Sequence, residues 1–316
     1  MKTANSVLDL IGNTPMTRLN KLIRNAEENV LVKLEYLNPS GSVKDRIALM
    51  MIEQAEKDGI LKPGYTIVES STGNTGISLS FVGTLKGYKV LIYETIPGKM
   101  DKERIGIMKR YGAEVKLIRP ELSEIKEVPG AEVELPGRKI CLDLEKNNPH
   151  VWWARQFSNP ANVAAHNKTG KEILAQTDGK LDAFVAAIGT GGTLMGVAEV
   201  LKARSPNVKI VGVQPAGSRF SIIPGQSYPK SDTSGGIISD MLGRKLVDEV
   251  FTINDDDAIN MAHRLWREEG LFAGISSGAN VLVAIKEAKK LGKGKTVVTV
   301  LPDSGDRYIT DEHFVT

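Results

Sequence analysis

Lys44 is the residue whose type and position first suggest covalent chemistry. The turn-forming stretch NPSGS at 38–42 runs into a helical pattern that continues through Met51 and Ala55, so Lys44 falls in the first turn of a helix capped by a hydroxyl. A helix N-terminus carries partial positive charge, which disfavours an ammonium but suits a neutral, reactive amine. Taken alone, Lys44 also fits a surface lysine whose charge points into water.

A second segment, GTGGT at 189–193, has the composition of an anion site. It offers backbone N–H groups, two hydroxyls and the start of a helix, which a phosphate monoester requires. The dinucleotide pattern G-x-G-x-x-G is not met, because the third residue after Gly191 is Leu194, and no Gly-Lys-Ser/Thr follows as in a P-loop. A strand-to-helix turn without a ligand is the alternative.

Two further polar loops follow strand-like runs. STGNT at 71–75 opens a helix after TIVES, and PDSGDRY at 302–308 follows TVVTVL, although Ser71 or Thr72 can equally serve only to start the helix. A reactive lysine, a phosphate cradle and neutral polar loops fit a cofactor that has both an aldehyde and a phosphate. Pyridoxal phosphate is that cofactor, and it needs a lysine, a phosphate pocket and a partner for its pyridine nitrogen.

Composition and spacing argue against several other classes of protein. Lysine and arginine (41) barely exceed aspartate and glutamate (38) and are scattered, so neither nucleic acid nor a membrane is an expected partner. The four histidines are isolated, without a pair at metal-ligand spacing, so no metal is expected. GISSG at 274–278 matches a serine-hydrolase elbow only by letters, because it follows no strand pattern.

The single cysteine, Cys141, excludes an intramolecular disulfide and fits a reducing compartment. We expect it to be a small buried or half-exposed thiol. The N-terminal stretch MKTANSVLDLIGNTP has no apolar core long enough for a signal peptide, and no apolar stretch approaches membrane-spanning length. These features predict a cytoplasmic protein.

Short runs rich in β-branched residues alternate with longer amphipathic segments and form two series. The first series is 30–36, 66–70, 89–94 and 114–118, and the second is 183–189, 209–214 and 296–301. Strands that are apolar on both faces and alternate with helices predict parallel sheets covered on both sides, here in two α/β lobes. The Pro- and Gly-containing stretches 119–137 and 216–236 predict a peripheral connection and a long functional loop.

The ordered segments IGNTPMTRL, NPSGSVKDR, STGNTGI, QFSNPAN, GTGGT, GISSGA and PDSGDRY resemble those of the cysteine synthase and cystathionine β-synthase family of fold-type II pyridoxal phosphate enzymes. The resemblance covers nearly the whole chain. It implies an α/β fold of two lobes, each an open, mostly parallel twisted sheet flanked by helices, with the cofactor in the cleft between lobes, usually in a homodimer. By this resemblance the smaller lobe is 35–150, and the larger combines 1–34 with 151–316.

The resemblance also implies roles for single residues. Lys44 resembles the Schiff-base lysine that moves the substrate α-proton, and Asn74 resembles the residue bonded to the cofactor's ring hydroxyl. Ser304 matches the serine at the pyridine nitrogen, where a neutral hydroxyl delocalises the carbanion less than an aspartate and favours loss of the β-substituent. The phosphate cradle corresponds to Gly189, Thr190, Gly191, Gly192 and Thr193. The clamp for the substrate α-carboxylate corresponds to Ser71, Thr72, Thr75 and Gln156.

The implied reaction is β-elimination from an L-serine derivative or cysteine to an aminoacrylate, followed by addition of a nucleophile. The default substrates are O-acetyl-L-serine and sulfide, which give L-cysteine. One departure points to an alternative: where the family has Gly-Ile-Gly-Ala-Gly-Phe-Ile-Pro, this chain has DTSGGIIS, so Asp232 occupies a glycine position facing the pocket.

Asp232 is then either a loop-surface aspartate or a base for an incoming nucleophile, including water. The second interpretation describes an enzyme that consumes cysteine and releases sulfide. A remote alternative is a non-catalytic, cofactor-binding sensor or partner protein. The intact set of Lys44, Asn74 and Ser304 argues against that third interpretation.

Overall fold

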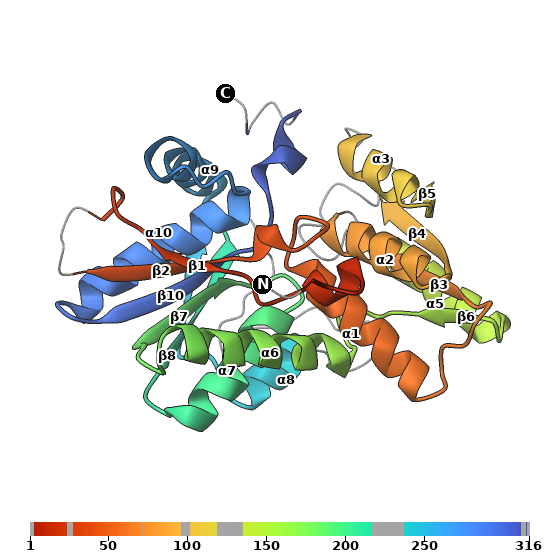
Figure 1. The fold of residues 1–316 in the computed structure, drawn as a ribbon, viewed down its shortest axis with the longest axis horizontal. Coiled ribbons are helices and arrows are strands. Elements are labelled where there is room, and N and C mark those ends of the chain that lie inside the picture. The colour runs from red at the N-terminus through yellow and green to blue at the C-terminus, as the bar shows by residue number, and fades with distance from the viewer. Residues whose placement is uncertain are drawn as a thin grey trace.

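The computed structural model describes residues 3–23, 28–71, 73–95, 102–118, 135–216, 237–310 and 314. They form an α/β protein with two lobes, each built on its own sheet (Figure 1). Within these ranges, no helix combines the length and the apolar character needed to span a bilayer.

The larger sheet has six strands in the order β1-β2-β10-β7-β8-β9. β1 and β2 are antiparallel, and all other neighbours are parallel. The strands are β1 (Met16–Arg18), β2 (Asn29–Leu34), β7 (Ala183–Ala187), β8 (Lys209–Pro215), β9 (Glu249–Ile253) and β10 (Thr296–Leu301). β2 and β10, from opposite ends of the sequence, pair along their whole length, from Asn29 with Thr296 to Leu34 with Leu301.

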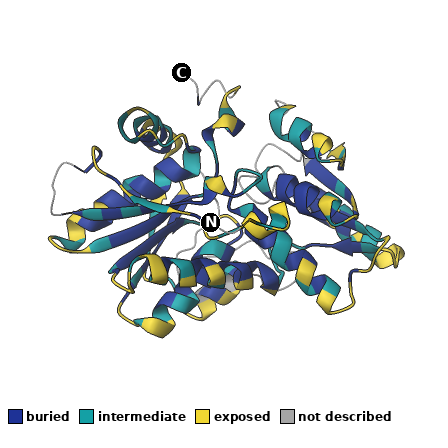
Figure 2. Ribbon diagram, in the orientation of Figure 1, coloured by how far each residue is buried: buried dark blue, intermediate teal, exposed yellow. Residues whose placement is uncertain are grey.

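Helices cover both faces of this sheet (Figure 1). One face carries α9 (Asp255–Arg264) and α10 (Ile275–Leu291), and the other carries α6 (Pro160–Gln176), α7 (Gly192–Arg204) and α8 (Ile237–Gly243). Neighbouring residues of β7 enter opposite cores, since Val185 packs with the α10 side chains and Phe184 with those of α7. Burial on both faces explains why the central strands β10, β7 and β8 are largely apolar, and strands at the middle of this sheet are dark blue in Figure 2.

The smaller sheet has four parallel strands in the order β5-β4-β3-β6. They are β3 (Thr66–Ser70), β4 (Lys89–Thr95), β5 (Glu114–Ile118) and β6 (Val151–Trp153). α1 (Lys44–Lys57), α2 (Asn74–Leu85) and α3 (Lys102–Arg110) lie on one side, and α5 (Leu135–Asn147) covers the other. Cys141 of α5 is buried against Val68, Tyr93 and Trp153, which confirms the buried thiol.

Short helical turns join these elements. They are η1 (Val7–Leu10), η2 (Glu35–Leu37), the π-helical turn η4 (Leu265–Glu269) and η5 (Gly305–Tyr308). The two lobes meet where α1 packs against α6. The lobe bounds, 35–150 for the smaller lobe and 1–34 with 151–316 for the larger, stay a prediction. β6, which begins at Val151, pairs with β3 in the smaller sheet. Most of the predicted connection at 119–137 and of the loop at 216–236 lies outside the described residues.

Candidate active site

A short antiparallel pairing of two loops brings the start of α1 beside the loop that follows β10. The Val43 N–H donates to the Pro302 carbonyl at 2.8 Å, and the Ser304 N–H donates to the Gly41 carbonyl at 3.2 Å. These backbone bonds join segments 41–43 and 302–304, which are distant in sequence. Two of the predicted site residues are held by this pairing. Lys44 directly follows the segment 41–43, and Ser304 belongs to the segment 302–304.

Lys44 is half-buried and is the first residue of α1. The Ser42 hydroxyl accepts the Lys44 backbone N–H at 3.3 Å, although the residue that precedes the helix is Val43, whose side chain provides no cap. Burial, together with the charges of Lys44 and Arg46, holds the pKa of the His166 imidazole well below its usual range. His166 is therefore neutral near pH 7, and the charge of Lys44 contributes to this low pKa.

The segment 189–193 forms an open turn into α7. Gly191 has φ +87°, a left-handed conformation that favours glycine, and a Cβ at Gly192 would collide with the Asn162 amide. Beside Gly189 the space is open: apart from its two chain neighbours, no described residue has a heavy atom within 4 Å of an added Cβ. The Thr193 hydroxyl lies 3.1 Å from Nε2 of His166, which fixes its orientation. The turn thus presents unobstructed backbone at the positive end of a helix.

A chain of buried hydrogen bonds links the predicted carboxylate clamp to this turn. The Thr75 hydroxyl donates to Oε1 of Gln156 at 2.6 Å. Nδ2 of Asn162 donates both to the Gln156 carbonyl at 2.7 Å and to the Thr190 hydroxyl at 3.0 Å. Asn162 was not predicted as a site residue, although it lies within the segment QFSNPAN. It connects the predicted carboxylate clamp with the predicted phosphate turn through hydrogen bonds.

Ser71 stabilises the start of α2. Its hydroxyl accepts the N–H of Gly73 at 3.2 Å and the N–H of Gly76 at 3.0 Å. The hydroxyl proton of Ser71 remains a donor, so this helix-start contact leaves it able to bind a ligand oxygen. Two predicted residues of the site, Thr72 and Asp232, lie outside the described residues.

Asn74, the first residue of α2, reaches across to the loop that follows β10. Its Nδ2 donates to Oδ2 of Asp303 at 2.6 Å, and the Arg307 guanidinium donates to its Oδ1. The Tyr308 hydroxyl also donates to Oδ2 of Asp303 at 2.6 Å. Burial, then the charge of Asp303, raises the pKa of Tyr308 well above its usual value, so the phenol stays protonated. Sequence reasoning missed Asp303 and Arg307, both within PDSGDRY.

A buried ion network involves Arg46, two residues beyond Lys44 in α1. Arg46 donates to Glu35 at 2.7 and 2.8 Å and to Glu172 of α6 at 2.7 Å through each of two nitrogens. Lys33, fully buried in β2, lies 2.8 Å from Glu172. Burial raises the pKa of Glu172, but its bonds to Arg46 and Lys33 outweigh that effect and lower the pKa to about 2. The network ties α1 to α6 and β2.

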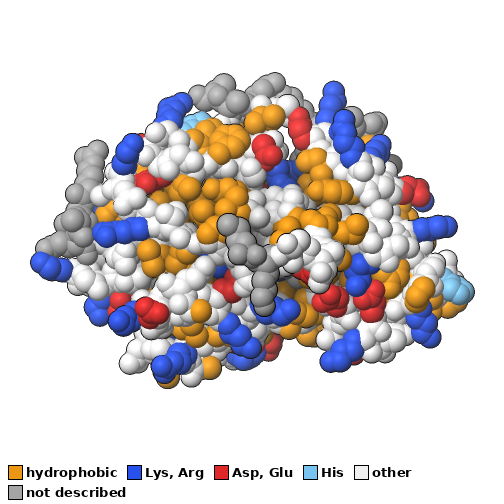
Figure 3. Space-filling view, in the orientation of Figure 1, with side chains coloured by type: hydrophobic (Ala, Val, Ile, Leu, Met, Phe, Trp, Pro, Cys, Tyr) orange, Lys and Arg blue, Asp and Glu red, His pale blue; other side chains and the backbone are white. Residues whose placement is uncertain are grey.

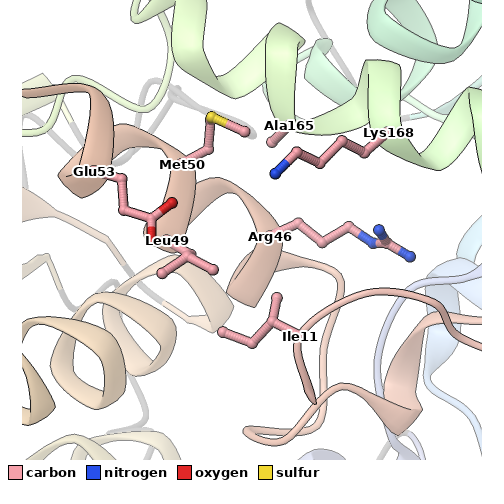
Figure 4. Close-up of a pocket in the computed structure, with 7 residues that line it drawn as sticks. All are labelled: Ile11, Arg46, Leu49, Met50, Glu53, Ala165 and Lys168. Carbon is pink, nitrogen blue, oxygen red and sulfur yellow. The ribbon is translucent and has the colours of Figure 1, made fainter. Parts of the chain in front are cut away.

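Between α1 and α6 lies a small hollow, lined by Ile11, Arg46, Leu49, Met50, Glu53, Ala165 and Lys168 (Figure 4). Lys168 extends from α6 toward α1 in this view. The hollow has a volume of about 30 Å³, which holds one or two waters and cannot hold an amino acid. Among the described residues, no group of three or more His, Cys, Asp or Glu side chains could hold a metal ion.

Comparison with known proteins identifies the family. Residues 7–303 match the family described as pyridoxal-phosphate dependent enzyme. The chain belongs to this family. This pyridoxal phosphate-dependent enzyme is 44% identical over 313 residues to the cysteine synthase of Staphylococcus aureus, a match that covers 98% of this chain and 96% of the relative.

Solved structures agree with this assignment. The enzyme resembles the cysteine synthase (OASS) of Entamoeba histolytica with a TM-score of 0.85 and 36% identity, over 100% of this chain and 92% of that chain. It also resembles a hydrogen sulfide-producing enzyme of Fusobacterium nucleatum with a TM-score of 0.83 and 38% identity, over 97% and 100% of the two chains. The fold is therefore that of the cysteine synthases.

The residues that the structure brings together fit pyridoxal phosphate. The turn at 189–193 leaves open space beside Gly189, and α7 begins within the same turn, at Gly192, so its N-terminal N–H groups suit a phosphate. A half-buried lysine, Lys44, is the first residue of α1. Ser304 makes no capping bond to η5, so its hydroxyl is not engaged in starting that helix.

Proposed function

We propose that this enzyme catalyses β-replacement on a β-substituted L-serine, with O-acetyl-L-serine and sulfide as substrates and L-cysteine as product. The observation that carries the proposal is the pairing of 41–43 with 302–304, which joins the start of α1 to the loop that carries Ser304. The cysteine synthases of S. aureus and E. histolytica, which match nearly the whole chain, support the same reaction.

In this proposal the cofactor would be held from both lobes. Lys44 would bind it covalently, the turn 189–193 would hold its phosphate, and Asn74 and Ser304 would contact its ring. When bound, the cofactor supplies an electron-accepting ring that stabilises negative charge at the substrate α-carbon. The neutral Ser304 hydroxyl can donate or accept a hydrogen bond but cannot hold a full positive charge on the ring nitrogen.

Lys44 would also move the substrate α-proton. The positive end of α1 favours a neutral amine over an ammonium at this position, and a neutral amine can accept that proton. The residue is half-buried, so bulk water reaches it less freely than it reaches an exposed surface lysine. Helix geometry and partial burial therefore support the same role that the resemblance implies.

The substrate α-carboxylate would bind at the start of α2, where backbone N–H groups and the dipole favour an anion. Ser71, Thr72, Thr75 and Gln156 are the proposed clamp. In the described conformation the Thr75 hydroxyl proton already bonds Gln156 at 2.6 Å. A hydrogen bond from Thr75 to a carboxylate would therefore require this contact to break, because a hydroxyl has only one proton.

The test is product formation by the cofactor-loaded enzyme. Incubation with O-acetyl-L-serine and sulfide should yield L-cysteine, identified by mass spectrometry, faster than incubation with L-serine and sulfide, because acetate leaves more readily than hydroxide. A loaded enzyme that forms no cysteine from either donor would overturn the proposal.

A second candidate function is favoured by the sulfide-producing neighbour of F. nucleatum. In that case the enzyme would consume L-cysteine, release sulfide and add water or another nucleophile, with Asp232 as the base. Asp232→Asn should then slow nucleophile addition, measured by stopped-flow absorbance, more than it slows sulfide release in a single turnover. Equal effects on the two steps would return Asp232 to a loop-surface role.

We also propose that the enzyme works as a cytoplasmic homodimer. Its smaller lobe would be 35–150 extended by β6, and its larger lobe would be 1–34 with the rest of 151–316. The single cysteine fits a reducing compartment. Basic and acidic side chains are interspersed over the described part of the face in Figure 3, which argues against a nucleic-acid partner. Sedimentation equilibrium of the loaded enzyme tests the dimer.

A further inference from the structure

The Asn74 amide lies between a group that can only donate hydrogen bonds and a group that accepts them. Arg307 donates to Oδ1, and Asp303 accepts from Nδ2 at 2.6 Å. A guanidinium has no acceptor, and an ionised carboxylate has no donor. A flipped amide would direct N–H against the guanidinium and C=O against the carboxylate, so only one orientation is compatible with both neighbours.

Both neighbours are buried and are held in place by further hydrogen bonds. Asp303 is 1% exposed and Arg307 is 5% exposed. Arg307 also donates to the Ser40 carbonyl, and the Asp303 carboxylate also accepts the Tyr308 hydroxyl. Neither side chain can turn away without leaving buried polar groups unpaired, which is costly.

The orientation determines what Asn74 can offer to a ligand. Nδ2 carries two hydrogens, and Asp303 uses one of them. The second N–H remains available, whereas Oδ1 is engaged by a cation. An N–H stabilises an ionised oxygen on a bound ring, whereas a carbonyl oxygen stabilises a protonated one.

We propose that Asp303 and Arg307 are positioning residues that make Asn74 a hydrogen-bond donor toward the cofactor's ring oxygen. This inference rests on the proposed function, in which Asn74 contacts that oxygen. Its consequence is that the bound cofactor keeps an ionised ring oxygen in the resting enzyme.

The test is the absorbance spectrum of the resting, cofactor-saturated enzyme. Forms with an ionised ring oxygen absorb at longer wavelength than forms with a protonated one. Arg307→Met combined with Asp303→Asn removes both groups that fix the amide, so the ratio of long- to short-wavelength absorbance should fall roughly tenfold, the value of one hydrogen bond to a charged group. Arg307→Met alone leaves Asp303 to orient the amide and should lower the ratio less. Arg307→Lys, which keeps a donor-only cation, should restore most of the ratio.

Tyr308→Phe is the matched control, because it removes a bond to Asp303 without touching Asn74. Tyr308→Phe should leave the absorbance ratio unchanged. A fall as large as that of the Arg307 variant would overturn the inference, because it would indicate a general loosening of the loop. If circular dichroism shows that Arg307→Met does not fold, Arg307→Gln replaces it, because an amide side chain can also accept a hydrogen bond from flipped Asn74.

Asn74→Ala separates the inference from the proposed function. If Asn74→Ala leaves the ratio at the wild-type value, Asn74 does not contact the ring oxygen, and that part of the proposed function fails. If Asn74→Ala lowers the ratio but the folded double variant does not, the contact stands and the positioning role of Asp303 and Arg307 is refuted.

Discussion

Replacing Glu172 with glutamine tests the buried ion network that ties α1 to the larger lobe. Pairing with Arg46 and Lys33 lowers the pKa of Glu172 from 4.5 to about 2, and the difference, 4.5 − 2, corresponds to about 3 kcal/mol. Loss of one partner from a buried ion pair typically costs about 3–5 kcal/mol, which agrees with this figure. The Glu172 side chain is only 15% exposed, so solvent screens the interaction little.

The sign of the pH dependence follows from the lowered pKa. The folded protein holds Glu172 ionised at a pH where the unfolded chain would protonate it, so ionisation stabilises the folded state above about pH 4.5. That stabilisation disappears as the pH falls toward 2. The difference in unfolding free energy between wild type and Glu172→Gln should therefore be about 3 kcal/mol at pH 7 and about half of that near pH 3.

Urea denaturation of the cofactor-free protein at the two pH values measures this difference. The matched control is Glu249→Gln, because Glu249 also contacts two lysines, Lys209 at 2.6 Å and Lys290 at 2.9 Å, but is 33% exposed. An exposed pair contributes up to about 1 kcal/mol, so the control should cost no more than that. Equal losses in the two variants, or a Glu172→Gln difference that does not shrink near pH 3, would refute the reasoning.

Two more predictions concern the residues of the proposed cofactor site, and each has a matched control substitution. Lys44→Ala should abolish turnover and the visible absorbance of the covalently held cofactor, whereas Lys168→Ala, in the small hollow, should keep both; a Lys44→Ala enzyme that stays yellow and active would contradict the assignment. Gly192→Ala should lower the unfolding free energy of the cofactor-free protein by about 1–3 kcal/mol, because its Cβ collides with Asn162. Gly189→Ala, which faces open space, should change it by less than about 0.5 kcal/mol, and equal losses would rule out the collision.

Most of the predicted strands are largely buried on both faces and therefore form runs of apolar, β-branched residues, although β5 is exposed or half-exposed along its length. The sequence did not reveal β1, β6 or β9. β1 and β6 have only three residues each, too few for a pattern. β9 lies at the edge of its sheet and is largely half-exposed, so it lacks a continuous apolar run.

The loops at strand ends could be predicted as a site because parallel strands bring their carboxyl ends to one edge of a sheet. The hydrogen bonds between side chains within that site could not be predicted. Asn74 and Asp303 are 229 residues apart, and no local spacing indicates that their side chains meet. Lys33 looks like a solvent-facing lysine in a strand, yet it is fully buried beside Glu172.

The pairing of β2 with β10 has a consequence for how the protein is made. Asn29 and Thr296 lie 267 residues apart, so at roughly 5–20 residues per second a ribosome makes β10 tens of seconds after β2. During that interval β2 lacks its neighbour, and the loop before Lys44 lacks the backbone of 302–304 that holds it. The lysine and its surroundings can assemble only once translation has passed residue 304. Cofactor binding at the proposed site would therefore report that the C-terminal strand and loop have been synthesised and have paired correctly.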